Sequence, residues 1–383
     1  MVGIMRIGID ARPLSHQLAG TGRLVLNLVM ELERLDQAND YFLYSKGDFR
    51  VPFENPRWRK RLQQKRRFEP SSYVFQTGVR QLIVEDRIDV FWETIHVLPF
   101  GLPGRLGKIV TVYDLVWRIF PETAERKFYY MQRLFTEPSI RRADRLICDS
   151  HSTLHDLGRI LGVPLEKVLV IYPGVLPDYR PRDPKYAAQY IARKYQTSEN
   201  YICTVGTVEP RKNVVALVEA VRILRARGDF GAQLLIAGGS GWRNSSIYES
   251  VGRAGLTERE IKFLGYVPEE DLPTLYSGAR IFVFPSLYEG FGIPLIEAMA
   301  CGVPVVASNV SSIPEVVQDA GILVSPRRPQ EFADAVARLE SDPELRFALI
   351  EKGLRRARDF RYDIAAQKVL RLFEEVAAEV QRR

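Results

Sequence analysis

Two glutamates, Glu289 and Glu297, flank a glycine-bearing loop and have seven residues between them. The loop contains Gly290 and Gly292, and Pro294 follows in what reads as the first turn of a helix, where a missing N–H costs little. Backbone N–H groups at a helix start bind anions, usually phosphate. Because carboxylates aimed at a phosphate would repel it, we expect both glutamates to accept hydrogen bonds from ribose or sugar hydroxyls. An ordinary helix start after a tight turn is the alternative.

A basic pair, Arg211 and Lys212, follows a buried apolar run that ends at Gly206. Pro210 breaks the strand, and a helical pattern begins near Asn213. Ligands of doubly wound sheets bind beyond the carboxyl ends of the strands, which is where this pair falls. Arginine can form two hydrogen bonds to phosphate oxygens and lysine adds a point charge, so the pair predicts a phosphate site. A solvated basic turn is the alternative.

Gly20, Thr21 and Gly22 follow the first predicted strand, and Arg23 opens a helix. Glycines there would let the backbone approach a diphosphate, although a simple turn explains them equally well.

Tyr113 and Asp114 also end a buried strand, and His96 follows another. Asp114 is expected either to orient an acceptor hydroxyl or to cap the next turn. A histidine at such a place is either structural or part of the acceptor side. The other histidines, His16, His151 and His155, have no metal-ligand spacing with acidic residues, so no metal site is predicted.

The stretch from Arg57 to Arg67 carries seven basic residues in eleven, with Trp58 inside it. A basic surface with an aromatic residue can contact an anionic membrane or a lipid pyrophosphate, and it can also bind nucleic acid. A solvated, mobile segment is the alternative.

The composition is that of a globular protein, with 383 residues, 46% hydrophobic residues, a net charge of +7 and a pI of about 9.2. A positive charge favours anionic partners but does not choose among them. The start of the chain does not resemble a signal peptide, and no apolar run is long enough to span a membrane. Cys148, Cys203 and Cys301 are far apart, so we expect buried thiols and a reducing cytoplasm.

Short β-branched runs alternate with longer amphipathic stretches, which predicts an α/β protein with parallel sheets. The predicted strands are 5–11, 41–45, 90–93, 109–113, 145–149, 168–172, 201–206, 233–237, 261–264, 281–285, 303–307 and 322–324. The predicted helices include 23–35, 127–142, 214–227, 295–300, 329–339, 343–358 and 363–379. The plan occurs twice, on either side of a proline-rich join at 173–198. Two doubly wound domains with a ligand between them are therefore expected.

Four segments together resemble retaining glycosyltransferase family 4. They are PSLYEGFGIPLIEAMACGVPVVAS, GTVEPRKN, LGYVPEEDLPTLYSGA and RRADRLICDSHST. In the first segment, Glu289 and Glu297 form the E-x7-E signature of the family. The loop at Gly20 also resembles the family. The resemblance covers nearly the whole chain. It implies a GT-B fold, with two Rossmann-like domains facing across a cleft and a last helix that crosses back to the first domain. The domains would be 1–180 with 361–383 on the acceptor side, and 181–360 for the nucleotide sugar.

The resemblance also implies roles for individual residues. Arg211 and Lys212 would hold the donor diphosphate, Glu297 the ribose and Glu289 the transferred sugar. The predicted catalytic set comprises Arg211, Lys212, Glu289 and Asp114. Tyr266 and Val267 would lie near the base. The remaining donor-binding residues would be Gly20, Thr21, Gly22, Gly206, Gly290, Phe291, Gly292, Ile293 and Leu295. The weaker acceptor-side set is Tyr113, Asp114 and His96. The family often has a histidine where this chain has Tyr113, so no imidazole at that position can be required here.

The implied activity is retaining transfer of a hexose, without metal or cofactor, to a glycan or a polyprenyl-pyrophosphate-linked acceptor. The protein would work in the cytoplasm, at the inner face of the plasma membrane if the basic stretch binds it. The segments 90–100 and 110–123 resemble bacterial mannosyltransferases of O-antigen and exopolysaccharide synthesis, which favours GDP-mannose over a UDP-sugar such as UDP-glucose. The rival interpretations are a non-catalytic nucleotide-sugar binder, a phosphorylase of the same fold and a nucleic-acid-binding protein; we expect no nucleic-acid partner.

Overall fold

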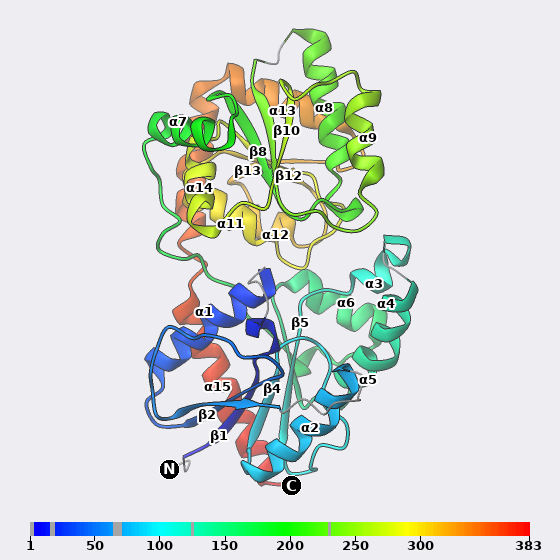
Figure 1. Ribbon diagram of the computed structural model, residues 1–383, viewed down its shortest axis with the longest axis vertical. Coiled ribbons are helices and arrows are strands. Elements are labelled where there is room, and N and C mark those ends of the chain that lie inside the picture. Colours follow the sequence, from blue (N-terminus) through cyan, green and yellow to red (C-terminus); the bar gives the residue numbers. More distant parts are fainter. Residues whose placement is uncertain (1–3, 16–19, 64–70, 124–125, 229–230) are drawn as a thin grey trace. The chain divides into compact units, whose positions relative to one another are not determined.

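The computed structural model describes residues 4–15, 20–63, 71–123, 126–228 and 231–383. The chain forms two compact units (Figure 1). Unit 1 comprises residues 1–174 with 361–383, and unit 2 comprises 175–360. The first unit therefore ends a few residues before the predicted boundary at 180. His16 and the basic residues at 65–67 lie outside the described residues.

Unit 1 contains a seven-stranded parallel sheet in the order β3-β2-β1-β4-β5-β6-β7. Its strands are β1 (Arg6–Asp10), β2 (Asp40–Ser45), β3 (Trp58–Leu62), β4 (Val90–Glu93), β5 (Gly107–Val112), β6 (Arg145–Cys148) and β7 (Val168–Val170). They are short and almost entirely buried, apart from β3 at the edge. Helices on both faces account for this continuous apolar pattern.

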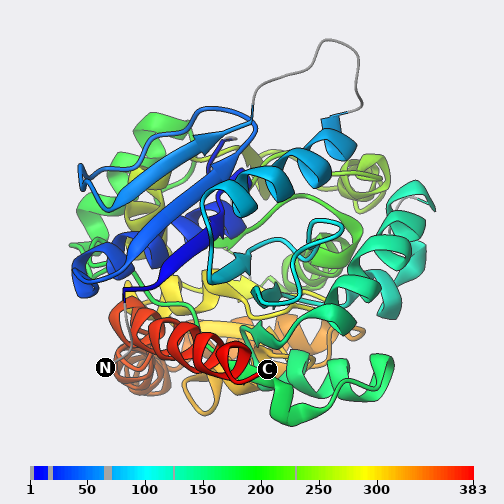
Figure 2. The same cartoon turned by 90° about the horizontal axis from the view of Figure 1, so that it is seen from below.

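The helices of unit 1 are α1 (Gly20–Leu35), α2 (Ser71–Glu85), α3 (Val116–Ile119), α4 (Arg126–Met131), α5 (Glu137–Arg142), α6 (His151–Leu161) and α15 (Tyr362–Gln381). α1 and α15 lie side by side on one face of the sheet, with α2 on the other (Figure 2). Trp92 of β4 packs against Phe373 of α15. On the second face, side chains of α2, α5 and α6 share one apolar core with β2, β4, β5 and β6. The prediction that the last helix joins the first domain is confirmed.

Unit 2 repeats the plan with six parallel strands in the order β10-β9-β8-β11-β12-β13. The strands are β8 (Tyr201–Val205), β9 (Gln233–Ala237), β10 (Ile261–Gly265), β11 (Phe282–Phe284), β12 (Val305–Ser308) and β13 (Gly321–Val324). The helices are α7 (Pro184–Tyr195), α8 (Val214–Arg227), α9 (Ser245–Arg253), α10 (Leu272–Gly278), α11 (Ile293–Ala300), α12 (Ile313–Val317), α13 (Pro329–Ser341) and α14 (Pro343–Ala357). α8, α9 and α13 share a core with one face of the sheet.

Each sheet has one point at which the strand order reverses. In unit 1 this point lies between β1 and β4, and in unit 2 between β8 and β11. The loops that follow these strands diverge there and leave a crevice for ligands in open α/β sheets. The residues that matter for function are therefore expected just after Asp10, Glu93, Val205 and Phe284.

Each strand predicted from the sequence is present within a few residues, and the predicted α/β architecture is confirmed. Three helical predictions need correction. The first helix begins at Gly20, so the glycines at 20 and 22 form its first turn rather than a loop before it. The predicted helix 127–142 is interrupted by a π-helical turn, Gln132–Thr136. The join at 173–198 contains α7, which belongs to unit 2.

The basic stretch is the clearest departure from the sequence analysis. Residues 58–62 form edge strand β3 instead of a solvated segment, and Trp58 is buried with its ring stacked on Tyr41 at 3.9 Å. Arg57 and Arg59 pair with Asp40, and Arg61 pairs with Asp86. These charges are partly neutralised within the fold, so they offer less to an anionic membrane than the sequence suggests. Membrane contact through this stretch stays a prediction.

The three cysteines are free and buried, as predicted. Within the described ranges, we find no helix of the length and apolar character needed to cross a bilayer.

Candidate functional site

An ion cluster joins the two loops at the switch point of unit 2. Arg211 and Lys212 lie in a 3-10 turn after β8, and Glu289 lies in the loop after β11. The Arg211 guanidinium donates to Glu289 Oε2 at 2.9 Å, and the Lys212 ammonium donates to Glu289 Oε1 at 2.6 Å. Glu209 accepts from the Nε of Arg211 at 3.0 Å. The two constellations that the sequence analysis placed separately therefore form one site.

The cations of this cluster are largely buried. The Arg211 side chain is 16% exposed and that of Lys212 is 15% exposed, so the alternative of a solvated basic turn is wrong. Burial raises the pKa of Glu289, but the charges of Arg211 and Lys212 outweigh burial and lower that pKa to about 2. Burial lowers the pKa of Lys212 below its ordinary value, although Glu289 opposes the shift. Burial also raises the pKa of Glu209.

The loop after β11 is fastened to its neighbours by hydrogen bonds. The Asn213 side-chain amide donates to the carbonyl oxygens of Pro285 and Pro326, and Asn213 itself has a φ of 53°, in the left-handed region. Asparagine tolerates that conformation better than most residues do. The Ser312 hydroxyl donates to the carbonyl oxygens of Glu289 and Phe291. Such bonds hold the Glu289 side chain at a fixed place relative to Arg211 and Lys212.

Helix α11 ends where the sequence predicts and begins at Ile293, two residues before the predicted start. Gly292 precedes it with a φ of 103°, and Pro294 occupies its first turn. Gly302, with a φ of 73°, follows its carboxyl end. The backbone N–H groups of the first turn of α11 therefore start beside the ion cluster and add partial positive charge there. The other predicted contact residues, Gly290, Phe291, Ile293 and Leu295, lie in this same loop and first turn.

Glu297, one turn inside α11, is 3% exposed. Its Oε2 accepts a hydrogen bond of 2.9 Å from the buried hydroxyl of Tyr276, on α10. Burial and the Glu297 charge raise the pKa of Tyr276 well above the ordinary value of a phenol. The sequence analysis did not single out Tyr276, although it lies within a segment quoted for the family resemblance. The bond fixes the carboxylate that is expected to bind ribose.

Two glycines bring the ends of β8 and β9 into close contact. A Cβ atom on Gly238 would lie 2.0 Å from the carbonyl oxygen of Gly206, so only glycine fits at 238. A Cβ atom on Gly206 would meet the Lys212 side chain at 3.4 Å. Gly206 therefore lies against a cation of the cluster, as its predicted place in the donor site requires. Tyr266 and Val267 follow β10; Tyr266 is 55% exposed, whereas Val267 is buried.

The acceptor-side residues predicted in unit 1 lie close together. The rings of His96 and Tyr113 are 5.5 Å apart and nearly perpendicular. Burial lowers the pKa of His96, while the Asp114 charge opposes the shift. Asp114 Oδ1 accepts from the backbone N–H of Val116 at 3.0 Å, so the capping role is present. His96 has a φ of 74°, and such strain often occurs at functional sites. Gly20, Thr21 and Gly22 lie in the first turn of α1.

Glu209, Asn213, Ser312 and Tyr276 are the parts of the unit 2 site that sequence reasoning missed. Glu209 stands two residues before Arg211, inside the GTVEPRKN segment, and the acidic residue next to a basic pair was the available signal. No local pattern shows that Ser312 and Tyr276 reach this site, because their partners are far away in the chain.

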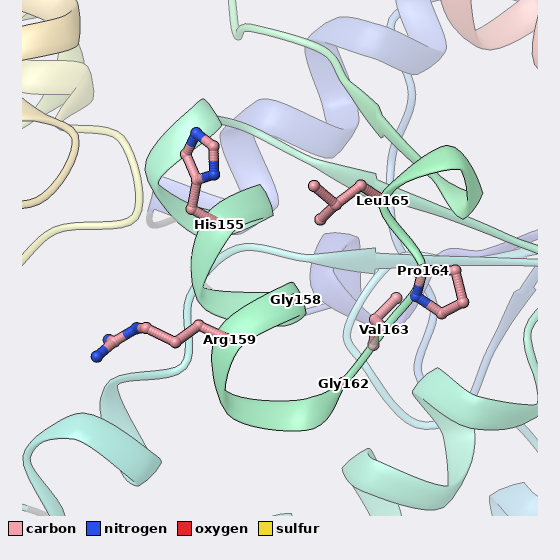
Figure 3. Close-up of a pocket in the computed structure, with 7 residues that line it drawn as sticks. All are labelled: His155, Gly158, Arg159, Gly162, Val163, Pro164 and Leu165. Carbon is pink, nitrogen blue, oxygen red and sulfur yellow. The ribbon is translucent and has the colours of Figure 1, made fainter.

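A pocket of about 530 Å³ lies elsewhere in unit 1 (Figure 3). It is lined by His155, Gly158, Arg159 and the turn Gly162–Leu165, at the carboxyl end of α6. That turn leads into the start of β7, so the pocket lies at the amino ends of the parallel strands. Ligands in this architecture bind at the carboxyl ends. None of the predicted site residues lines it. Among the described residues, no group of three or more His, Cys, Asp or Glu side chains is arranged to hold a metal ion.

Comparison with known proteins identifies the family. Residues 191–356 match the family described as glycosyl transferases group 1, and residues 18–179 match glycosyltransferase family 4. The O-antigen chain mannosyltransferase B of Escherichia coli is 32% identical over 97% of this chain and 100% of that protein. The O-antigen chain mannosyltransferase RfbU of Salmonella typhimurium is 26% identical over 71% of this chain and 70% of that protein.

The fold has solved counterparts. A sucrose-phosphate synthase from Thermosynechococcus elongatus superposes with a TM-score of 0.77 and 22% identity, covering 98% of this chain and 100% of that one. The sequence match over the full length of a relative, the two family domains and the two parallel sheets agree with one another. The chain therefore belongs to the family 4 glycosyltransferases, has the GT-B fold and is a hexosyltransferase.

Proposed function

We propose that this chain transfers a mannosyl group from GDP-mannose to a glycan or polyprenyl-pyrophosphate-linked acceptor during synthesis of a cell-surface polysaccharide. The relative that matches over its full length is an O-antigen chain mannosyltransferase, which supports the sugar and the pathway class. The observation that carries the reaction type is the meeting of Arg211, Lys212 and the start of α11 at the switch point of unit 2. The reaction takes place in the cytoplasm, where nucleotide sugars are made.

The chemical difficulty of the reaction is the departing diphosphate, which gains negative charge as the glycosidic bond breaks. Preorganised positive groups lower this barrier, and removing one such donor typically costs about 10²–10³ in rate. Arg211, Lys212 and the first N–H groups of α11 supply this charge from the protein itself, so the proposed reaction needs no metal. Glu289 accepts hydroxyls of the transferred sugar, and Glu297 those of the ribose.

The proposed stereochemistry is retention. The acceptor oxygen attacks the face from which the diphosphate leaves, and a phosphate oxygen of the donor accepts the hydroxyl proton. The glycosyl group and the proton thus exchange partners, and the products are the glycoside and the protonated nucleoside diphosphate. No side chain is required as a covalent nucleophile. Unit 1 binds the acceptor, beside Tyr113, Asp114 and His96.

The test is a transfer reaction with the full chain and EDTA, using GDP-mannose or UDP-glucose as donor and a bacterial lipid extract or methyl α-mannoside as acceptor. An α-linked mannoside, identified by the proton NMR spectrum of the product, is the expected result. A β-linked product contradicts retention, and activity that appears only with added Mg²⁺ contradicts the metal-independent mechanism. Transfer from UDP-glucose alone replaces the donor assignment, and no transfer from either donor contradicts the proposed function.

A further inference from the structure

A second charged cluster lies at the switch point of unit 1, and none of its members belongs to the predicted site. Arg12 follows β1, and its Nε donates to the two carboxylate oxygens of Asp10 at 2.9 and 3.0 Å. Its Nη2 donates to Asp10 Oδ2 at 2.7 Å and to Glu93 Oε1 at 2.8 Å. Asp10 ends β1 and Glu93 ends β4, so the cluster joins the two strands between which ligands of such sheets bind.

The cluster contains two carboxyl groups and one guanidinium, almost out of contact with water. The Asp10 and Glu93 side chains are 0% exposed, and the Arg12 side chain is 16% exposed. Burial and the adjacent Asp10 charge raise the pKa of Glu93 well above its ordinary value, so Glu93 favours its protonated form. One guanidinium faces two carboxyl groups here, so the cluster carries no net positive charge. Only Arg12 reaches the surface.

Two buried polar atoms of this region have no hydrogen-bond partner among the described residues. They are Glu93 Oε2 and the hydroxyl oxygen of Tyr113. Tyr113 follows β5, the neighbour of β4, and burial together with the charges of Asp149 and Asp10 raises its pKa. Tyr113 therefore lies at the carboxyl end of the strand next to β4. A protonated Glu93 can donate to Asp10, but the buried Tyr113 hydroxyl has no such partner in the described part of the chain. Because buried polar atoms in proteins are normally hydrogen-bonded, this hydroxyl indicates a polar ligand at these strand ends.

Fold stability does not explain the cluster well. Replacing a buried ion pair by apolar side chains is often neutral or stabilising, so such a pair is weak evidence for a stabilising role. β1 and β4 are already joined by their backbone pairing. The switch point of unit 2 carries a comparable arrangement, in which buried carboxylates hold Arg211 and Lys212. Cations paired with buried carboxylates thus occur at the switch point of both sheets.

We propose that Arg12 and the Tyr113 hydroxyl bind hydroxyl groups of the acceptor, a neutral pyranoside, and that Asp10 and Glu93 hold Arg12 in position for it. The inference rests on the proposed function, because it takes the acceptor to be a glycan. A cluster without net positive charge suits a polyol better than a phosphate, so the ligand is the terminal sugar of the acceptor rather than its pyrophosphate. Asp10 and Glu93 are positioning residues, since neither side chain is exposed.

The test uses saturation-transfer NMR with methyl α-mannoside on the full chain, together with calorimetric titration of GDP-mannose into the same samples. Arg12→Lys keeps the charge but loses the planar fork, and Glu93→Met keeps the size but loses both polar atoms. Glu93→Gln reproduces the hydrogen-bonding pattern of the protonated acid. Asp36→Asn is the matched control, because Asp36 is also a buried, hydrogen-bonded carboxylate of unit 1 but precedes β2 at the opposite edge of the sheet.

The wild type, Glu93→Gln and Asp36→Asn are expected to bind the mannoside and to transfer saturation to it. Arg12→Lys and Glu93→Met are expected to bind it about tenfold more weakly, as the loss of one hydrogen bond to a charged group gives. GDP-mannose affinity stays within about twofold in all variants, since unit 2 is unchanged. A wild type that does not bind the mannoside, or an Arg12→Lys variant that binds it as the wild type does, overturns the inference. Failure of the wild type to bind GDP-mannose instead contradicts the proposed function. Arg12→Lys decides the matter if thermal melting shows that Glu93→Met is unfolded.

Discussion

Lys212 donates a hydrogen bond of 2.6 Å to Glu289, whose other carboxylate oxygen accepts one from Arg211 at 2.9 Å. The residue proposed to recognise the sugar is therefore also the counter-ion of the two cations proposed for the diphosphate. On the proposed function, a diphosphate that enters the site would compete with Glu289 for these cations. Glu289 would then be free to accept from the sugar hydroxyls, which would couple donor binding to sugar recognition.

The first prediction concerns Glu289→Gln. Removing the carboxylate charge takes away the competitor of the diphosphate, so the affinity for GDP is expected to rise about threefold to tenfold. The rate of transfer is expected to fall about 10²-fold, because the sugar hydroxyls lose the carboxylate that accepts their hydrogen bonds. Calorimetry with GDP and a transfer assay measure the two effects. Parallel loss of GDP affinity and of transfer would contradict the counter-ion role.

The second prediction concerns Arg211→Lys. Alanine at this position would leave Glu209 and Glu289 buried without their shared partner, so lysine is the better test of function in a folded protein. One of the two forked hydrogen bonds is lost, and the rate of transfer is expected to fall about 10²–10³-fold with little change in melting temperature. Arg222→Gln is the control, because Arg222 forms an exposed pair with Glu219 on α8. Equal rates for the two variants would remove Arg211 from the mechanism.

The third prediction is a loss of donor affinity at alkaline pH. The pKa of Lys212 is below its ordinary 10.5, so its ammonium loses the proton at a lower pH than an exposed lysine does. Affinity for GDP is expected to be full near neutral pH and to fall as pH rises through the lowered pKa. Lys212→Arg keeps its charge over this range, so its affinity profile should be flat. Identical alkaline profiles for both proteins would rule out Lys212 as the titrating group.

The same ion pairs give a prediction at acid pH. The pKa of Glu289 is lowered to about 2 from an ordinary value of 4.5. Its contribution to stability is therefore fully present above 4.5 and is lost as pH falls through the folded value. Glu289→Gln is expected to lessen the acid-dependent fall in stability between those limits, as urea titrations at several pH values would show. An unchanged pH dependence would mean that Glu289 is not strongly paired.

The fifth prediction compares two buried tyrosines of unit 2. Tyr276 donates to the Glu297 carboxylate, and Tyr201 donates to the backbone carbonyl of Leu275 at 2.8 Å. Tyr276→Phe is expected to cost about 1.5–3 kcal/mol of unfolding free energy and Tyr201→Phe about 1 kcal/mol, since bonds to charged groups are stronger. Urea denaturation measures both values. Only Tyr276→Phe should also weaken GDP binding, through the displaced Glu297.

The sequence predicts the architecture well because buried parallel strands have a distinctive pattern. Runs such as 201–205 and 233–237 are apolar apart from Thr204 and Gln233 and alternate with amphipathic helices, so strand and helix order follow directly. β3 breaks this rule, since Trp58–Leu62 is largely charged. Its pairing with β2, the stacking of Trp58 on Tyr41 and the nearby carboxylates outweigh the local composition.

The candidate site is predicted only in part. Sequence position places Arg211 and Glu289 after strands of the same sheet, and the strand order then makes those strands neighbours. It does not show that their side chains form ion pairs, because this depends on how the two loops fold. A solvated basic turn therefore remained an alternative, whereas Glu209 and Glu289 hold Arg211 largely buried. The Asp10–Arg12–Glu93 cluster was missed for the same reason, since Glu93 lies 81 residues after Arg12.

The central claim is that unit 2 binds a nucleoside-diphosphate sugar through Arg211 and Lys212. The most direct test is calorimetric titration of the wild type and Arg211→Lys with GDP, UDP, GDP-mannose and UDP-glucose in the presence of EDTA. The account predicts selective micromolar binding of GDP and GDP-mannose by the wild type and a marked weakening in the variant. A folded wild-type protein that binds none of the four would contradict the donor site.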